Sequence, residues 1–132
     1  MKTRVISIDG VELVAPDGYT TTCNSLNEFT DCCGPGDGFF ERIIPDSILG
    51  LRISAACDIH DYCFSHGANT WADFHQANSI FMKNILSIIT SRSMTGLAWL
   101  RVIIASFYFK AVDEIGARIY KSIQHAKGLV MQ

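Results

Sequence analysis

Apolar residues in the middle of the chain recur at the spacing of an α-helix. From Phe74 to Ile89 they fall three or four residues apart, so that they share one face of a helix. Thr70 precedes this stretch, and Asp73 three positions later completes what resembles a capping box. The pattern predicts a long helix that begins after Thr70 and ends near Thr90.

Two further helices are predicted on either side of this one. Upstream, Ser54 is a candidate N-cap, and Gly67 lies where such a helix would stop. This helix and the one after it form a predicted pair within residues 54–90. Downstream, apolar periodicity continues through residues 95–126, although Gly116 weakens the prediction of one unbroken helix there.

The longest apolar run, from Leu97 to Phe109, is interrupted by Arg101. It is well short of the roughly 20 residues that a helix needs to span a bilayer. We therefore expect this segment to be a core helix of a globular domain.

The first part of the chain has weaker periodicity. Residues 1–22 alternate loosely, with turn residues at Asp9-Gly10 and Asp17-Gly18, and predict a short hairpin or an extended arm. Residues 31–50 are rich in glycine and proline and predict a loop that presents bare amides and carbonyls. A loop of this composition suggests a bound ligand.

The size of the chain limits how these elements are combined. Its 132 residues, 48% of them hydrophobic, suit one domain with one modest core. We expect an all-α fold over residues 1–132, whose parts are an arm at 1–30, the loop region at 31–50, two facing long helices at 54–90 and a third helix at 95–126. With 11 basic against 13 acidic residues and no basic patch, nucleic acid is an unfavourable partner.

All the cysteines lie in the first half of the chain, at Cys23, Cys32, Cys33, Cys57 and Cys63. This density is typical of an oxidising compartment, and the odd number leaves at least one of them unpaired within the chain. The N-terminal stretch is broken by Ser7, Asp9 and Gly10 and lacks the apolar core of a secretory signal. We expect a secreted or extracellular protein, whose signal was removed or which is exported by another route.

The densest polar chemistry is the segment Cys57–Cys63, which places His60 beside Asp61. Adjacent helical residues point about 100° apart, so these two side chains serve neighbouring sites, one for a proton and one for a cation. Calcium prefers oxygen ligands, and the glycine-rich loop Asp31–Gly38 can add backbone carbonyls to the Asp61 carboxylate.

Three segments together resemble the secreted phospholipase A2 family. They are Cys33-Gly34-Pro35-Gly36, then Ile44-Pro45-Asp46-Ser47, then Ala56-Cys57-Asp58-Ile59-His60-Asp61-Tyr62-Cys63. The likeness covers roughly residues 31–85. It is specific in combination, because a Cys-x-x-His-Asp-x-Cys helix and a preceding glycine loop would each be weak alone.

The resemblance implies a calcium-dependent hydrolase of phospholipid esters. His60 would take a proton from the water that attacks the sn-2 carbonyl, without a covalent acyl-enzyme. Asp61 and the carbonyls of Cys32, Gly34 and Gly36 would hold calcium, which polarises the ester carbonyl, and the Gly34 amide would be a second donor to the oxyanion. The expected partners are phospholipid membranes or micelles.

One position departs from the family, which orients its histidine with an aspartate. Here Asn78 occupies that place, on the apolar face of the second helix, where its amide oxygen can accept the Nδ1 proton of His60. An amide cannot offset the charge of an imidazolium, so reduced activity is expected. Asp73 and Asp113 are the alternative orienters, although helix capping already accounts for Asp73.

The resemblance also implies a disulfide between Cys33 and Cys57, which would tie the calcium loop to the catalytic helix. Cys63 has no later cysteine to pair with, so Cys23 or Cys32 takes that place or the Cys63 thiol stays free.

Other interpretations of these residues have less support. A zinc site from Cys32, Cys33, Cys57 and His60 lacks paired Cys-x-x-Cys knuckles, and the glycine loop lacks the Gly-Lys-Ser/Thr ending of a nucleotide loop. His66, His75 and His125 are interpreted as structural or exposed. Six apolar residues near the loop form either an exposed collar for a lipid interface or part of the core: Phe39, Phe40, Ile43, Ile44, Leu49 and Leu51.

The resulting hypothesis is sn-2 hydrolysis of glycerophospholipids with His60 as general base. The competing class is a phospholipase-like protein that binds calcium or lipid, or acts as a toxin subunit, because Asn78 leaves hydrolysis slow or absent. Head-group preference and oligomeric state depend on surface shape and are not set by these motifs.

Overall fold

The computed structural model describes residues 1–29, 47–67 and 70–128 and contains strands as well as helices. Its elements in chain order are β1 (Thr3–Ile8), β2 (Val11–Pro16), the 3-10 helix η1 (Leu26–Glu28), β3 (Ser47–Ile48), β4 (Leu51–Arg52), α2 (Ser54–His66), α3 (Trp71–Arg92), α4 (Thr95–Glu114) and α5 (Gly116–Ala126). The prediction of an all-α fold is wrong, because two antiparallel sheets of two strands each accompany the helices.

The first sheet is the hairpin β1–β2, one of the two alternatives that the sequence left open. Ile8 pairs with Val11, so Asp9 and Gly10 form a two-residue turn, with φ of 56° and 79°. Asp-Gly suits such a turn because both of its residues adopt positive φ, and the twist of the turn matches that of the strands. The strands are short, so their alternating pattern is a weaker signal in the sequence than the periodicity of the long helices.

The hairpin is fixed to the helices through a side chain of α3. Asn84, fully buried, accepts a hydrogen bond from the Val14 amide at 2.7 Å and donates one to the Val14 carbonyl at 2.8 Å. The amide side chain thus satisfies both backbone groups of one β2 residue, as a neighbouring strand would.

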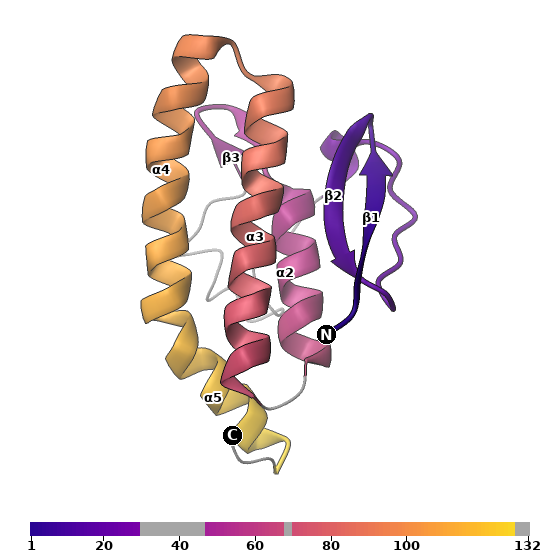
Figure 1. Ribbon diagram of the computed structural model, residues 1–132, viewed down its shortest axis with the longest axis vertical. Helices are drawn as coiled ribbons and strands as arrows, with labels where there is room; N and C mark the ends of the chain where they lie inside the picture. Colours follow the sequence, from indigo (N-terminus) through magenta and orange to yellow (C-terminus); the bar gives the residue numbers. More distant parts are fainter. Residues whose placement is uncertain (30–46, 68–69, 129–132) are drawn as a thin grey trace.

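The three long helices lie side by side, with the hairpin on the side away from α4 (Figure 1). α3 is the central element, because it packs against α2, α4 and β2. Its inward residues form much of the core: Phe74, Ala77, Asn78, Ile80, Phe81, Asn84, Ile85, Ile88 and Ile89.

The helix boundaries confirm two of the three residues that were predicted to begin or end a helix. The Thr70 hydroxyl caps α3 by accepting a hydrogen bond from the Asp73 amide at 3.1 Å, and Gly67 ends α2 by donating its amide to the Cys63 carbonyl at 2.9 Å. The prediction that Ser54 caps α2 is wrong, since Ile53 is the cap residue and the buried Ser54 hydroxyl has no hydrogen-bond partner among the described residues.

The C-terminal segment forms two helices, α4 and α5, which are separated at Ile115. The change of direction brings Gly116 against the core, where an added Cβ would lie 3.7 Å from Phe74 and 3.8 Å from Phe64. Tyr120 of α5 packs its ring on the same two phenylalanines. The predicted single helix is therefore interrupted just before Gly116, which begins α5, and an added Cβ there would make ordinary van der Waals contacts with the core.

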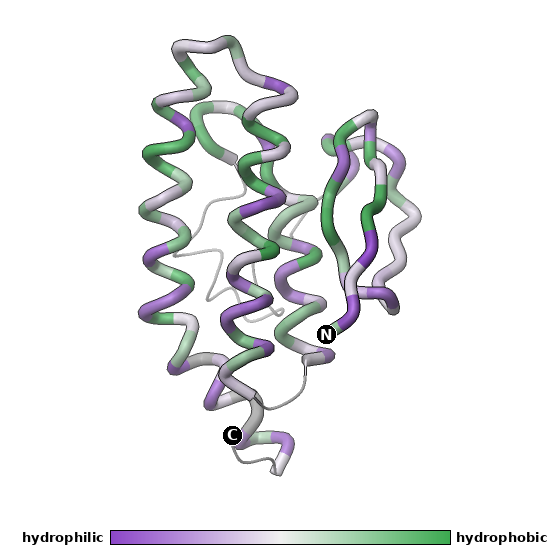
Figure 2. The backbone as a smooth tube through the Cα atoms, viewed as in Figure 1, coloured by the Kyte–Doolittle hydropathy of each residue, from purple (hydrophilic) through white to green (hydrophobic). Residues whose placement is uncertain are grey.

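The expectation that Leu97–Phe109 is a core helix is wrong, because most of the surface of this helix is not buried. Among the described residues of α4, those buried are Arg101, Ala105 and Val112, while Trp99 is 71% exposed and Phe107 68% exposed. The outer face of α4 comprises Leu97, Trp99, Leu100, Ile103 and Phe107, and hydrophobic positions run along this helix in Figure 2.

The segment Thr95–Ser122 is also long and apolar enough to cross a membrane by length and composition alone. Its most apolar 18-residue window has a mean hydropathy of 1.3, and 17% of that window is buried. One such helix is weak support for a membrane span. It does show that the apolar character of this segment is not explained by core packing.

Candidate active site

The predicted general base lies at the interface between α2 and α3. His60 projects from α2 and is 3% exposed, and its Nε2 atom is 2.9 Å from Oδ1 of Asn78 on α3. The imidazole stacks on Phe81, with ring centroids 4.6 Å apart, and also contacts Phe64. The structure therefore brings together the two residues that the sequence paired across the helices.

The ring nitrogen that faces Asn78 differs from the expectation. The sequence predicted that the Nδ1 proton would lie at this contact, and the structure places Nε2 there. The packing of α2 against α3 decides which edge of the His60 ring points at Asn78. The spacing of the two residues in the sequence does not contain this information. With Nε2 used in this contact, Nδ1 is the nitrogen with which His60 would accept a proton.

Asn78 has a second polar contact, on its other side. Its Nδ2 donates to Oδ1 of Asp113, on α4, at 3.4 Å. A carboxylate only accepts hydrogen bonds, so the amide nitrogen faces Asp113 and the amide oxygen faces His60. Oδ1 of Asn78 must then accept a proton from Nε2, which places the imidazole in the Nε2–H form with its lone pair on Nδ1.

The surroundings of His60 keep its ring neutral. Burial lowers the pKa of His60 to about 4, because an imidazolium would lose its hydration there, and the hydrogen bond to Asn78 opposes this shift. A neutral imidazole at physiological pH has the lone pair that a general base requires. The low pKa also makes it a weak base.

Asp61 follows His60 on α2 and is partly exposed. The other predicted calcium ligands, Cys32, Gly34 and Gly36, lie outside the described residues, as does the predicted Gly34 oxyanion donor. Within residues 1–29, 47–67 and 70–128, no group of three or more His, Cys, Asp or Glu side chains is placed to hold a metal ion. Of the predicted ligand set, Asp61 is thus the one whose place in the fold is known.

The described cysteines test only part of the predicted disulfide pattern. Cys23 and Cys63 are free thiols, so no disulfide joins two of the cysteines in the described ranges, and the predicted partner of Cys57, Cys33, lies outside them. Of the alternatives for Cys63, the free thiol is the one observed. Burial raises the pKa of Cys63 to about 12.

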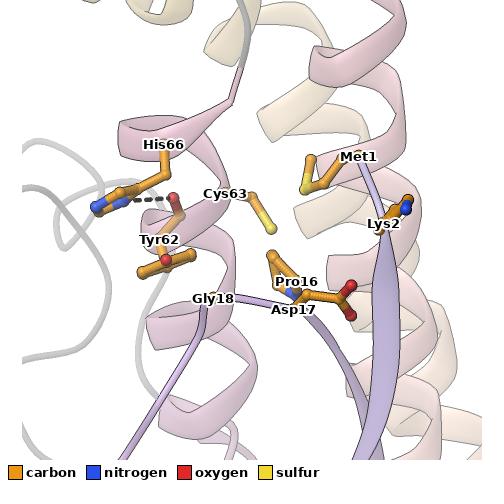
Figure 3. Close-up of a pocket in the computed structure, with 8 residues that line it drawn as sticks. All are labelled: Met1, Lys2, Pro16, Asp17, Gly18, Tyr62, Cys63 and His66. Atoms are coloured by element: carbon orange, nitrogen blue, oxygen red, sulfur yellow. Dashed lines mark hydrogen bonds between the residues drawn. The ribbon is translucent and has the colours of Figure 1, made fainter.

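Cys63 borders a pocket of about 310 Å³ between the hairpin and α2. Figure 3 shows Met1, Lys2, Pro16, Asp17 and Gly18 on the hairpin side and Tyr62, Cys63 and His66 on α2. The His66 ring stacks on Tyr62 and its Nδ1 donates to the Tyr62 carbonyl at 3.2 Å, which accounts for this exposed histidine as a structural residue. The pocket does not include His60.

The structure also places the two alternative orienters of His60 and part of the suggested apolar collar. Asp73 lies in the first turn of α3, where its amide donates to the Thr70 hydroxyl, and its carboxylate lies 3.6 Å from the Met1 amine. Asp113, by contrast, is the acid that contacts Asn78. Leu49 is exposed and Leu51 half-buried; the other four residues of the suggested collar lie outside the described residues. The contact of Asn78 with Asp113 was missed because it joins positions 35 residues apart.

Comparison with known proteins gives no relative for this chain: no family model, no curated protein and no solved structure matches it.

Proposed function

We propose that the protein hydrolyses the sn-2 ester bond of glycerophospholipids in a calcium-dependent reaction. The observation that carries the proposal is the buried contact between His60 Nε2 and Asn78 Oδ1 at 2.9 Å. With Nε2–H directed at Asn78, Nδ1 carries the lone pair of the neutral imidazole and is the atom that would accept a proton from water. The three motifs that resemble secreted phospholipase A2 supply the substrate class and the metal.

In this proposal each residue of the helix pair has one task. His60 Nδ1 removes a proton from the attacking water, and the resulting imidazolium keeps its Nε2–H directed at Asn78. Stacking on Phe81 limits the rotation of the ring, so the lone pair stays aimed at one position.

Calcium completes the proposed site with chemistry that the helix pair lacks. Asp61 and the carbonyls of Cys32, Gly34 and Gly36 are oxygen donors, as calcium prefers, and would hold it. When bound, the ion supplies positive charge that polarises the ester carbonyl and stabilises the oxyanion.

The outer face of α4 supports a substrate that is aggregated lipid. Trp99, Ile103 and Phe107 lie on one side of the helix and are 71%, 53% and 68% exposed. Contiguous apolar residues of this kind are unfavourable in water and favourable in the boundary between lipid head groups and acyl chains. A hydrolase acting at a membrane or micelle surface gives this face a role.

A second candidate function is a phospholipase-like protein that binds calcium or lipid without rapid turnover, as a toxin subunit would. Asn78 favours it, because the neutral amide cannot stabilise an imidazolium on a ring whose pKa burial already lowers.

A hydrolysis assay with mixed micelles of phosphatidylcholine distinguishes the two functions. We expect release of the sn-2 fatty acid with added calcium, loss of release with excess chelator, and loss in His60→Gln. His66→Gln is the matched control, since it changes an exposed histidine of the same helix and should leave turnover intact. Calcium binding by calorimetry without any lysophospholipid product would support the second function, and chelator-resistant hydrolysis would contradict both.

A further inference from the structure

Three helices contribute to one line of polar side chains, which runs from the buried His60 and Asn78 to the partly exposed Asp113. His60 on α2 contacts Asn78 on α3 at 2.9 Å, and Asn78 contacts Asp113 on α4 at 3.4 Å. We propose that Asp113 is a positioning residue that fixes the orientation of the Asn78 amide and, through it, the tautomer of His60. The catalytic consequence rests on the proposed hydrolysis, whereas the structural consequence does not.

The two ends of an asparagine amide have nearly the same shape and opposite hydrogen-bonding roles. If the Asn78 amide were reversed, its NH₂ group would face His60 and require the lone pair on Nε2, which moves the proton to Nδ1. An imidazole with Nδ1–H cannot accept a proton from water at that atom. Holding the amide in one orientation is therefore a condition for His60 to act as a base.

Asp113 favours one of these two orientations. Its Oδ1 is an acceptor, so it favours the state in which Nδ2 of Asn78 points at α4. The side chain of Asp113 is 44% exposed, so it keeps part of its hydration.

His75 is a second neighbour of the Asp113 carboxylate. Its Nδ1 lies 3.6 Å from the same Oδ1 atom that Asn78 contacts, and the His75 ring is 64% exposed.

The primary test reads the His60 tautomer directly by ¹⁵N NMR of histidine-labelled protein. We expect the wild type to show the Nε2–H form, and Asp113→Ala to add a population with Nδ1–H. Glu114→Gln is the matched control, because it removes the same charge from the next residue of α4, which is exposed. A folded Asp113→Ala protein with an unchanged His60 tautomer would overturn the proposal.

Kinetics give a second readout. Asp113→Ala should lower kcat about tenfold, the scale of one charge-assisted hydrogen bond, and leave KM within about twofold, because the change acts on the base and not on lipid binding. An equal loss in Glu114→Gln would indicate a general effect of charge on α4 and contradict the inference. If the wild type hydrolyses nothing, the proposed function fails, while the NMR comparison still decides the role of Asp113.

A charge exchange supplies a test that does not depend on losing a side chain. Asn78→Asp alone sets two carboxylates at the 3.4 Å separation of the present contact, so that one of them must bind a proton. Adding Asp113→Asn returns one carboxylate and one amide, with the carboxylate now next to His60. We expect the double variant to exceed the single Asn78→Asp variant in kcat by about tenfold; equal values would show that positions 78 and 113 are not coupled.

Discussion

Replacement of Asn84 by leucine should detach the N-terminal hairpin from the helices. The side chain makes two hydrogen bonds to Val14, at 2.7 and 2.8 Å, and is fully buried. Leucine has a similar volume, so the variant removes the polar partner without opening a large cavity. Each backbone group left unsatisfied costs about 1–3 kcal/mol. Since Val14 itself is only partly buried, water can reach part of this contact, and we expect a total loss of about 2–4 kcal/mol.

Urea unfolding followed by far-UV circular dichroism measures this loss. Lys83→Leu is the matched control, because it introduces the same side chain at the preceding, exposed position of α3 and should change stability by less than about 0.5 kcal/mol. Hydrogen exchange adds the location, since amides of β1 and β2 should lose protection before those of α3. A loss below about 1 kcal/mol for Asn84→Leu, with hairpin amides still protected, would refute the argument that Asn84 anchors the hairpin.

Three further predictions concern the rest of the molecule. Arg101 donates to the carbonyls of the β3–β4 turn, so Arg101→Met should lower stability by about 2–3 kcal/mol and increase hydrogen exchange in that turn. Burial raises the pKa of Cys63 to about 12, so the thiolate is scarce and a disulfide reagent at pH 8 should modify Cys63 only after denaturation, whereas the half-buried Cys23 reacts first. Ile103→Glu should reduce binding to phosphatidylcholine vesicles in a flotation assay without lowering Tm, and Ser106→Glu, an exposed site on the same helix, should have a smaller effect.

Local sequence features predicted the parts of the fold that are decided locally. Thr70 and Gly67 mark a helix start and a helix end because their hydrogen bonds involve residues three or four positions away. Asp9-Gly10 marks a hairpin for the same reason, since the turn needs two residues at positive φ. Ser54 failed as a cap because the chain enters α2 one residue earlier, at Ile53.

The orientation of α4 could not be predicted in this way. Apolar residues occupy more than one side of this helix, so their spacing does not indicate which side packs against α3. The structure selects the side with Arg101, Ala105 and Val112, where a buried guanidinium donates to carbonyls of β3 and of the turn that follows it. The larger apolar residues, which sequence alone would have assigned to the core, remain outside.

The departure at Asn78 and the position of Asp113 are one feature of the site. By the resemblance to secreted phospholipase A2, Asn78 lies where an orienting aspartate is expected, so the sequence suggests a loss of negative charge beside His60. In the structure, Asp113 lies on the far side of that amide, 3.4 Å from its nitrogen. A carboxylate is therefore still present near His60, with the Asn78 amide between the two. An aspartate at position 78 would face Asp113 at the same distance and repel it. The amide at position 78 and the acid at position 113 are therefore compatible with each other in a way that two acids are not, and the value of either residue for the base depends on the other.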